Sequence, residues 1–316
     1  MFWRMESNPQ LTVIIVNYNT KDLLLECLAS VFESAPSTTL EPVVVDNASI
    51  DGSCEAIRKA YPSVTTIANG TNRGFGAACN QALSVTAAPL ILLLNSDAQL
   101  NPCALNALRN TMHLHPRCGA AGCRMVNSKG TELTSTRNFL TPFNHALELF
   151  GLTENVRSPL FRRTHRPVLD RDLLDCSVDW IDASCLMLRR AALEEVGLFD
   201  ERFFMYSEDE DLCLRLRKGG WSVCFSAAGS AFHHGGASTT HKRHEMLEHY
   251  YSGQLRLLRK YRGRGAARVY AALMSVVLRA KNLLYRCLPG KARAEEFSER
   301  LSALRQACTA FTQPEQ

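Results

Sequence analysis

Residues 11–19 read LTVIIVNYN, and this stretch decides the fold. Its first six residues form a largely apolar run rich in β-branched side chains, which is typical of a parallel strand covered on both faces. The run stops at Asn17-Tyr18-Asn19, and the segment that starts at Thr20 carries apolar residues at helical spacing. The stretch therefore predicts a buried strand, a polar loop and a helix.

The same unit recurs along the first hundred residues. Further strands are expected at 42–45, 64–67 and 90–94, with helices at about 53–61 and 77–84 between them. This alternation predicts a doubly wound, mainly parallel α/β sheet. A helix over about 101–118, strands over 120–126 and 185–188, and a helix over 190–196 closed by Gly197 extend the pattern.

Four polar clusters follow the predicted strands. They are Asn17–Asn19, Asp46–Ser49, Asn72–Gly74 and Asn95–Asp97. Ligands of such sheets bind beyond the carboxyl ends of the strands, where loops and helix N-termini converge. One cluster alone is explained as well by ordinary turn residues, but the coincidence of four favours a binding site.

An unbroken row of four carboxylates occupies residues 208–211. The row follows the aromatic and apolar residues 203–206, so we expect it to lie against the core. Ser207 and Glu210 have the spacing of a capping box, and acidic residues in a first helical turn complement the helix dipole. A partly buried carboxylate can also serve as a general base, because burial raises its pKa. Both interpretations are open on these residues alone.

Two further groups could bind a metal. Asp97 follows a buried strand, with Asn95 two residues earlier, and oxygen ligands of this kind can hold a divalent cation that binds a diphosphate. A turn that ends the strand is the alternative. His233 stands beside His234 and Gly235-Gly236, where an imidazole could complete a metal shell or contact phosphate.

Composition and charge restrict the class of protein. The chain has 316 residues, 46% of them hydrophobic, which is ample for a packed core. From Gln254 onward there are 13 Lys and Arg against 4 Asp and Glu, but this basic tail lacks interleaved aromatic residues suited to base stacking, so we expect no nucleic-acid partner. Neither a signal peptide nor an apolar stretch of about 18 residues is present, so we expect a cytoplasmic protein or one attached to the inner face of the membrane.

The tail has helical periodicity from Arg268 onward. Polar residues recur on one side at Arg268, Ser275, Arg279, Asn282 and Arg286, and apolar residues on the other at Val269, Leu273, Val276, Val277, Leu283 and Leu284. A basic amphipathic helix of this kind can lie in an anionic membrane interface. Packing on the rest of the chain, including a homodimer contact, is the alternative.

Taken together, these residues resemble the inverting GT-A glycosyltransferases of family 2, and within that family the bacterial rhamnosyltransferase-like branch. The matching segments, in chain order, are 16–19, 45–52, 72–80, 95–97, 179–180, 197–204, 208–212 and 233–238. They cover roughly residues 11–251, and their combined order and spacing are more specific than any single motif. One departure is Ala183, where many relatives have Gly.

The resemblance implies roles for individual positions. The nucleotide pocket would comprise Asn17, Tyr18, Asp46, Ser49, Asn72, Arg73, Asn95 and Ser96. Asp97 and His233 would hold Mg²⁺ or Mn²⁺, and Asn95, in place of the motif's first Asp, implies weaker metal binding. Asp209 would be the catalytic base, supported by Glu208. The acceptor side would be supported by Trp180, Asp182 and Asp211.

The resemblance also implies an architecture and a reaction. A GT-A domain would span 1–253, with a Rossmann-like nucleotide-binding half over about 11–126 and an acceptor half over about 127–253, and the helical tail would span 254–316. The reaction would be inverting, metal-dependent transfer of a sugar from a nucleoside-diphosphate sugar, dTDP-L-rhamnose, to a hydroxyl of a glycan or lipid-linked acceptor. A UDP-hexose donor is one alternative, and a non-catalytic sugar-nucleotide-binding or scaffold protein is another.

Overall fold

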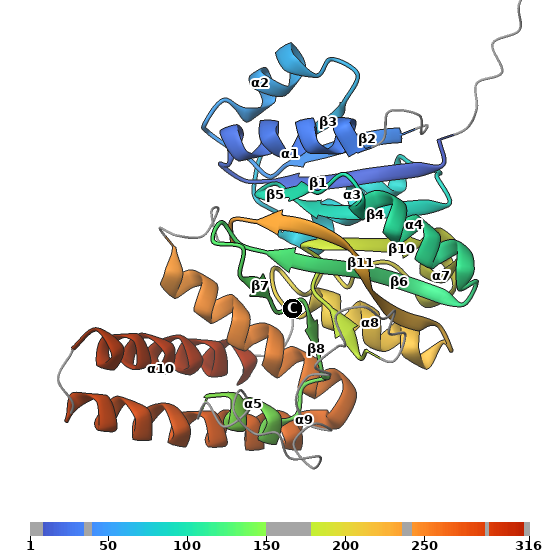
Figure 1. The fold of residues 1–316 in the computed structure, drawn as a ribbon. Helices are drawn as coiled ribbons and strands as arrows, with labels where there is room; N and C mark the ends of the chain where they lie inside the picture. Colours follow the sequence, from blue (N-terminus) through green and yellow to red (C-terminus); the bar gives the residue numbers. More distant parts are fainter. Residues whose placement is uncertain (1–8, 35–39, 150–177, 236–241, 288–290, 313–316) are drawn as a thin grey trace, which may run out of the picture. The chain divides into compact units, whose positions relative to one another are not determined.

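The computed structural model describes residues 9–34, 40–149, 178–235, 242–287 and 291–312 (Figure 1). The chain divides into two units, which are described separately. Unit 1 comprises Met1–Arg137, Val168–Glu201 and Asp209–Ser238, and unit 2 comprises Asn138–Pro167, Arg202–Glu208 and Thr239–Gln316.

The centre of unit 1 is a nine-stranded sheet in the order β3-β2-β1-β4-β10-β6-β11-β5, with β7 paired to β6. The strands are β1 Leu11–Asn17, β2 Leu40–Asp46, β3 Thr65–Ala68, β4 Leu90–Asn95, β5 Ala98–Leu100, β6 Cys118–Val126, β7 Glu132–Leu133, β10 Cys185–Arg189 and β11 Ser222–His233. A separate two-stranded sheet pairs β8 Thr136–Arg137 with β9 Trp180–Ile181.

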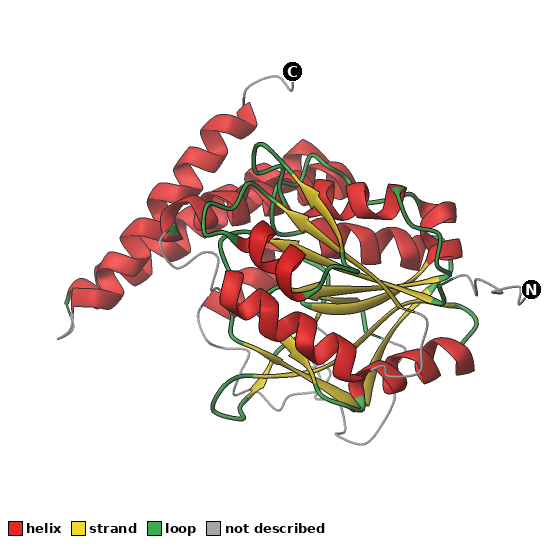
Figure 2. Ribbon diagram, turned by 90° about the horizontal axis from the view of Figure 1, so that it is seen from above, coloured by secondary structure: helices red, strands yellow, loops and turns green. Residues whose placement is uncertain are grey.

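Helices cover both faces of this sheet (Figure 2). They are α1 Lys21–Ser34, α2 Ser53–Ala60, α3 Phe75–Ser84, α4 Ala104–Leu114, α7 Arg190–Val196 and α8 Glu208–Lys218. The apolar residues whose spacing predicts α1 form the face that this helix buries, since Leu24, Cys27, Leu28 and Val31 are all inaccessible to solvent. Gly197, at φ +88°, ends α7 as expected.

The first half of the sheet has the predicted parallel arrangement. β1 pairs in parallel with both β2 and β4, and β2 pairs in parallel with β3. Every residue of β1 except Val16 is buried, as expected for a strand covered on both faces. The register places Asn17 opposite Asp46, so the polar residues that end these two strands are neighbours.

Beyond β4 the sheet is mixed, which the sequence patterns did not indicate. β10 runs antiparallel to both β4 and β6, and β11 pairs in parallel with β6. The twelve-residue β11 was not predicted, because Ser, Ala and Gly in its middle hide the alternation of a strand. The predicted helix over 101–118 is shorter, at Ala104–Leu114, and Cys118 already begins β6.

Unit 2 is helical. Its described part contains α5 Pro142–Leu149, α9 Arg243–Arg286 and α10 Lys291–Thr312, and α9 and α10 pack along each other (Figure 1). Gly263 interrupts α9 at φ +83° and ψ 172°, so the segment consists of two helices joined at a kink. A buried core joins them, including Tyr251, Tyr270, Met274 and Leu304.

The predicted apolar side of the tail helix needs correction. Val277 is buried, together with Ala267, Tyr270, Met274 and Leu278, which form the face that packs in the core of unit 2. Val269, Val276, Leu283 and Leu284 lie outside that face and are exposed. The second half of α9 therefore has two apolar sides, only one of which is covered by described residues.

The segment that precedes α8 is held in an unusual conformation by α9. Tyr206 and Ser207 are consecutive non-glycine residues with positive φ, at +68° and +69°, a conformation that L side chains rarely adopt. Within unit 2, the Gln254 amide donates a hydrogen bond to Ser207 Oγ at 3.0 Å, and the rings of Tyr206 and Tyr250 meet edge to face. These contacts offset the strain of the turn.

Gly253 makes this contact possible, and its replacement gives a first prediction. A Cβ at this position would lie 2.7 Å from the backbone oxygen of Tyr206 and 3.1 Å from Ser207 Oγ. Because backbone cannot move aside cheaply, we expect Gly253→Ala to destabilise the protein by about 1–3 kcal/mol, measured by urea denaturation.

Gly265→Ala is the matched control for that measurement. Gly265 lies in the same helical segment, and nothing is within 4 Å of the position of its Cβ. Alanine should stabilise the first turn of the second helix there, by less than about 1 kcal/mol. Equal effects of the two substitutions would contradict the role of Gly253.

The structure leaves two expectations of the sequence open. The division into a catalytic domain over 1–253 and a tail over 254–316 stays a prediction, and its boundary lies inside α9. Of the predicted segment 233–238, the residues from Gly236 lie outside the described residues. Among the described helices, none is long and apolar enough to span a membrane.

Candidate active site

The ends of β1 and β2 are joined by buried side chains. Asn17 Nδ2 donates hydrogen bonds to Asp46 Oδ1 at 2.7 Å and to Ser49 Oγ at 3.0 Å. Asp46 Oδ2 accepts from the backbone N–H of Ser49 at 3.0 Å, and Ser49 Oγ accepts from the backbone N–H of Asn19 at 2.8 Å. The two predicted polar clusters therefore form one network, which fixes the shape of both loops.

A second set of bonds connects this network to the end of β4. Thr20 Oγ1 donates to Asn17 Oδ1 at 2.7 Å, so the 2.7 Å contact between the Thr20 and Ser96 hydroxyls has Ser96 as donor. Both hydroxyl residues are buried. Ser96 is thus positioned by residues that precede α1, and the cluster 95–97 is brought to the same edge of the sheet as Asn17. Tyr18, which follows Asn17 in the chain, is partly buried.

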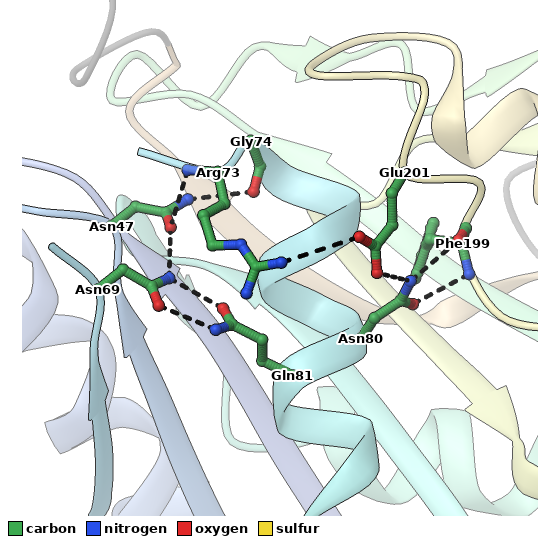
Figure 3. Close-up of polar contacts among 8 residues, drawn as sticks. All are labelled: Asn47, Asn69, Arg73, Gly74, Asn80, Gln81, Phe199 and Glu201. Atoms are coloured by element: carbon green, nitrogen blue, oxygen red, sulfur yellow. Dashed lines mark hydrogen bonds and ion pairs between the residues drawn. The ribbon is translucent and has the colours of Figure 1, made fainter. Parts of the chain in front are cut away.

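The loop before α3 is held by Asn47, a residue for which the sequence suggested no role (Figure 3). Asn47 Nδ2 donates to the backbone oxygen of Gly74 at 3.1 Å, and Asn69 Nδ2 donates to Asn47 Oδ1 at 2.8 Å. Asn72 Oδ1 accepts from the backbone N–H of Gly74 at 2.9 Å. Gly74 has φ +84°, which explains why glycine stands at the start of α3.

The other side of α3 is linked to the segment after α7. Asn80 exchanges two hydrogen bonds with the backbone of Phe199, at 2.9 and 3.0 Å, and a third with Glu201 Oε1 at 3.0 Å (Figure 3). Glu201 also lies 4.0 Å from the guanidinium of Arg73, with both side chains about half exposed. Asn80 therefore links α3 to the segment after α7. The contact with Glu201 directs the Arg73 side chain across α3.

Asp97 and His233 are in direct contact. His233 Nε2 lies 3.0 Å from Asp97 Oδ1 and 3.3 Å from Asn95 Nδ2. The pairing of β11 with β5 brings them together, because His233 is the register partner of Ala98. The backbone N–H of His234 donates to the Asp97 carbonyl at 3.0 Å, which fixes the end of β11 against the 95–97 loop.

The protonation of His233 decides which of these contacts forms. A protonated Nε2 donates to Asp97, whereas an unprotonated Nε2 can accept from Asn95. Burial lowers the pKa of His233, but the hydrogen bond and the negative charge of Asp97 outweigh it, and the pKa is raised. A proton therefore favours the Asp97 contact, and a cation at this point would compete with that proton.

Asp182 lies in the loop between β9 and β10. Its Oδ1 accepts a 2.5 Å hydrogen bond from Ser184 Oγ, and its backbone N–H donates to the Ser135 carbonyl at 3.0 Å. Burial raises the pKa of Asp182, and the Ser184 bond, the charge of Arg137 and the charge of His233 offset part of that rise. Asp182 is therefore near enough to His233 for their charges to interact.

Asp209 is the second residue of α8 and the first residue of that helix that belongs to unit 1. Its Oδ1 accepts from the backbone N–H of Glu210 at 2.8 Å and its Oδ2 from that of Ala183 at 3.2 Å. Burial and then the charge of Asp182 raise the pKa of Asp209 to about 6, although the two backbone bonds and Arg137 lower it. A carboxyl group in this range is ionised at neutral pH and can accept a proton.

These groups form a connected series within unit 1. Asp97 bonds to His233, His233 interacts with Asp182, and Asp182 raises the pKa of Asp209. The Ala183 contact to Asp209 connects Asp182 and Asp209 through one peptide unit. Asp97 and Asp209, 112 positions apart in the sequence, therefore belong to one electrostatic cluster.

A divalent cation that is shared with a diphosphate fits the residues present. Asp97 and His233 offer a carboxylate oxygen and an imidazole nitrogen 3.0 Å apart, and Asn95 adds an amide. The described residues contain no group of three or more His, Cys, Asp and Glu side chains that could hold a metal ion by themselves. Mg²⁺ and similar ions commonly use one or two protein ligands and take the rest from water and substrate phosphates.

The remaining predicted residues have contacts of other kinds. Asp211 is buried, and its Oδ2 pairs with Arg215 Nε at 2.9 Å, while Arg215 also donates to the carbonyls of Val196 and Gly197 at the end of α7. Trp180 is the register partner of Arg137, whose guanidinium lies 5.8 Å from the indole ring. Glu208 is buried in unit 2 and contributes to a raised pKa of Tyr206, after burial itself.

Arg137 and Ser184 were not recognisable as site residues from the sequence. Arg137 is a basic residue in an irregular segment, and only the pairing of β8 with β9 brings its charge near Asp182 and Asp209. Ser184 stands in a run of small residues and is recognisable only by its bond to Asp182. Both depend on contacts between segments that are distant in the chain.

Comparison with known proteins identifies relatives of the chain. A family model described as Glycosyl transferase family 2 matches residues 12–197. An N-acetylglucosaminyl-diphospho-decaprenol L-rhamnosyltransferase of Mycobacterium tuberculosis is 30% identical over 243 residues, which are 72% of this chain and 77% of that protein.

Solved structures share the fold. The mannosyltransferase PcManGT of Pyrobaculum calidifontis, solved with GDP-Man and Mn²⁺, has a TM-score of 0.55 at 17% identity and covers 96% of this chain and 87% of its own. GalNAc-T7, solved with UDP, GalNAc and Mn²⁺, has a TM-score of 0.53 at 13% identity, covering 71% and 43%. Together with the sheet and the C-terminal helices, this confirms the GT-A fold class expected from the sequence.

Proposed function

The chain belongs to family 2 of the glycosyl transferases, and from that membership we propose that it transfers L-rhamnose from dTDP-L-rhamnose, with inversion, to a hydroxyl of a glycan or lipid-linked acceptor. The rhamnosyltransferase of Mycobacterium tuberculosis supports the sugar, and its name supports a lipid-linked acceptor. The observation that carries the proposal is the electrostatic series from Asp97 through His233 and Asp182 to Asp209.

Asp209 is the general base of the proposed reaction. Its pKa of about 6 leaves the carboxylate ionised at pH 7 yet basic enough to take the proton of an acceptor hydroxyl. The hydroxyl oxygen then forms a bond to the anomeric carbon as the bond to the nucleoside diphosphate breaks. Attack from the face opposite the leaving group inverts the anomeric configuration. The backbone bonds from Glu210 and Ala183 hold the carboxylate in place.

Asp97 and His233 are the proposed ligands of Mg²⁺ or Mn²⁺. A divalent cation, when bound there, supplies positive charge that offsets the negative charge developing on the leaving diphosphate. The backbone N–H of His234 donates to the Asp97 carbonyl, which holds the end of β11 at the proposed ligands. The presence of Mn²⁺ with two proteins of this fold supports the choice of cation.

The network at the ends of β1 and β2 is the proposed nucleotide pocket. Asn17, Asp46 and Ser49 are bonded to one another, so they present a pre-formed surface for the base and ribose. Tyr18, Asn72, Arg73, Asn95 and Ser96 complete the proposed nucleotide contacts, and Arg73 brings a positive charge suited to phosphate. Trp180, Asp182, Asp211 and Glu208 are proposed to support the acceptor side and the base.

The donor can be tested directly. The full chain is incubated with Mn²⁺, a soluble acceptor analogue and one nucleotide sugar at a time, and release of nucleoside diphosphate is measured. We expect dTDP-L-rhamnose to give the largest kcat/KM. A larger value with a UDP-hexose would support the alternative donor, and binding without any release would support a non-catalytic sugar-nucleotide-binding protein. The same assay with proton NMR of the product reports the anomeric configuration.

The acid limb of the pH profile gives a second prediction. Because Asp209 must be ionised, kcat/KM should fall as the pH drops through about 6. Asp182→Asn keeps an acceptor for Ser184 but removes a negative charge that raises the Asp209 pKa, so the limb should move to lower pH. The measurement is kcat/KM from pH 4.5 to 8.

Asp22→Asn is the control for this shift. Asp22 is an exposed carboxylate on α1, 87% accessible, and its loss should leave the limb in place. An unmoved limb in Asp182→Asn would argue that Asp182 does not influence the base.

The proposal includes a cytoplasmic location, where nucleotide sugars are available to the site.

A further inference from the structure

The second half of α9 carries an exposed apolar stripe. Val269, Val276 and Leu283 are seven residues apart, so they lie on one side of the helix, and they are 60%, 63% and 66% exposed. Leu284, beside them, is 55% exposed. No other part of the described chain places four large exposed apolar side chains on one helix, and clusters of this kind mark interaction surfaces.

The stripe is separate from the face that stabilises the helix. Tyr270, Met274 and Leu278 are fully buried and pack with α10 in the core of unit 2. A helix on the surface of a folded unit needs only one buried face, and the residues of the stripe are not part of that core. The exposed residues are therefore free to make a different contact.

A row of arginines runs beside the stripe. Arg268, Arg279 and Arg286 are exposed and are separated by eleven and seven residues, which places them on one side of α9 next to the apolar stripe. Their own segment offers no acidic residue to balance them, since the chain between residues 249 and 294 contains eleven Lys and Arg and no Asp or Glu. The surface is both apolar and strongly positive.

This charge decides between the two partners that the spacing allows. A seven-residue repeat would suit pairing with α9 of a second copy. Such pairing would combine the positive charge of two such segments with no carboxylate in either segment to neutralise it, which is unfavourable. An anionic lipid surface instead offers acyl chains to the stripe and phosphate groups to the arginines, whose long side chains reach outward to the headgroups.

We propose that the face of α9 formed by Val269, Val276, Leu283, Leu284 and the arginines 268, 279 and 286 binds an anionic lipid bilayer, with the helix lying in the plane of the interface. The proposal deepens the proposed function and rests on it, because it would hold the chain at the kind of surface that carries a lipid-linked acceptor.

The test measures vesicle binding by the full chain, independently of sugar transfer. Co-sedimentation is measured with vesicles of phosphatidylcholine alone and with vesicles containing phosphatidylglycerol, at low and high salt. We expect binding to the anionic vesicles only, weakening as salt rises. The double variant Val276→Glu/Leu283→Glu should bind at least about tenfold less, because it removes apolar contact and adds negative charge.

A matched double variant controls for the substitutions themselves. Val85→Glu/Leu114→Glu changes side chains that are 59% and 69% exposed in unit 1, and it should bind vesicles like the unmodified chain. Both variants should keep the unmodified melting temperature and the kcat with a soluble acceptor analogue. Normal vesicle binding by Val276→Glu/Leu283→Glu would overturn the proposal. So would a dimer in sedimentation velocity that this variant dissociates, because the stripe would then bind a second copy.

The outcomes separate the inference from the proposed function. Vesicle binding without sugar transfer would keep the lipid surface and remove the transferase assignment. Transfer to a soluble acceptor without vesicle binding would keep the transferase assignment and remove the lipid surface.

Discussion

Asp209→Asn is expected to lower kcat by about 10³-fold while the protein stays folded, because the variant loses the proposed general base. Asparagine has nearly the shape of aspartate, and its one oxygen can still accept a backbone hydrogen bond from Glu210 or Ala183. The amide cannot take a proton from an acceptor hydroxyl. The loss should therefore fall on kcat, with little change in the dissociation constant of the nucleotide sugar.

Stability provides a second signature of the same substitution. Asp209 has a pKa of about 6 in the folded chain and 3.8 as the ordinary value, so the folded state binds its proton more tightly. Stability from this group is present below about pH 4 and is lost as the pH rises through 6. Asparagine does not ionise and avoids that loss. The melting temperature of Asp209→Asn, relative to that of the unmodified chain, should therefore rise between pH 5 and pH 8.

The measurement combines single-turnover kinetics with thermal unfolding at several pH values. Asp211→Asn is the contrasting variant, because Asp211 is buried against Arg215, which bonds to the end of α7. Its loss should lower the melting temperature, with a smaller effect on kcat. A near-normal rate for Asp209→Asn would remove Asp209 from the mechanism, and a pH-independent difference in melting temperature would contradict its raised pKa.

Local sequence patterns predict the first half of the fold well. β1, β2 and β4 are buried on both faces, so their apolar runs are long and their ends are marked by polar residues. The clusters around Asn17, Asp46 and Asn95 were expected together because carboxyl ends of parallel strands meet at one edge, and the bonds of Asn17 and Thr20 connect them. Here local pattern and tertiary packing agree.

The second half depends on contacts that a single sequence does not reveal. β11 contains Ser226, Ala227, Ala228 and Gly229, which have weak strand preference, and its place in the sheet comes from pairing with β6 and β5. Gly229 shows the reason for such small residues, since a Cβ there would lie 3.1 Å from the backbone of Ala104 in α4. A close approach of helix and strand selects glycine, and periodicity cannot show it.

The candidate site divides in the same way. Residues in recognisable motifs, such as Asp97 and Asp209, were named from the sequence, whereas Arg137 and Ser184 act on Asp182 through tertiary contacts. Their effect is electrostatic and depends on distance. The pKa of Asp209 follows from burial and from Asp182 together, so the chemistry of the carboxylate is a property of the fold.

Asp97→Asn is expected to lower kcat/KM by at least about 100-fold, because the proposed metal site would lose the carboxylate that contacts His233. The side chain keeps its shape, and an amide oxygen binds a divalent cation more weakly than a carboxylate does. Half-maximal activity should then require a higher Mn²⁺ concentration. Treatment of the unmodified chain with a chelator should abolish transfer, and added Mn²⁺ should restore it.

Binding can be measured apart from turnover. Titration calorimetry with Mn²⁺ in the presence of a nucleoside diphosphate should show weaker binding for Asp97→Asn, and a smaller weakening for His233→Asn. Asp51→Asn is the matched control, because Asp51 accepts bonds from the backbone of Lys21 and Ser53 and an asparagine can keep one of them. The same Mn²⁺ dependence in Asp97→Asn as in Asp51→Asn would show that Asp97 does not bind the metal. The leaving diphosphate would then have to be stabilised by protein charges alone, and Arg73, a proposed nucleotide contact whose side chain is about half exposed, would be a candidate.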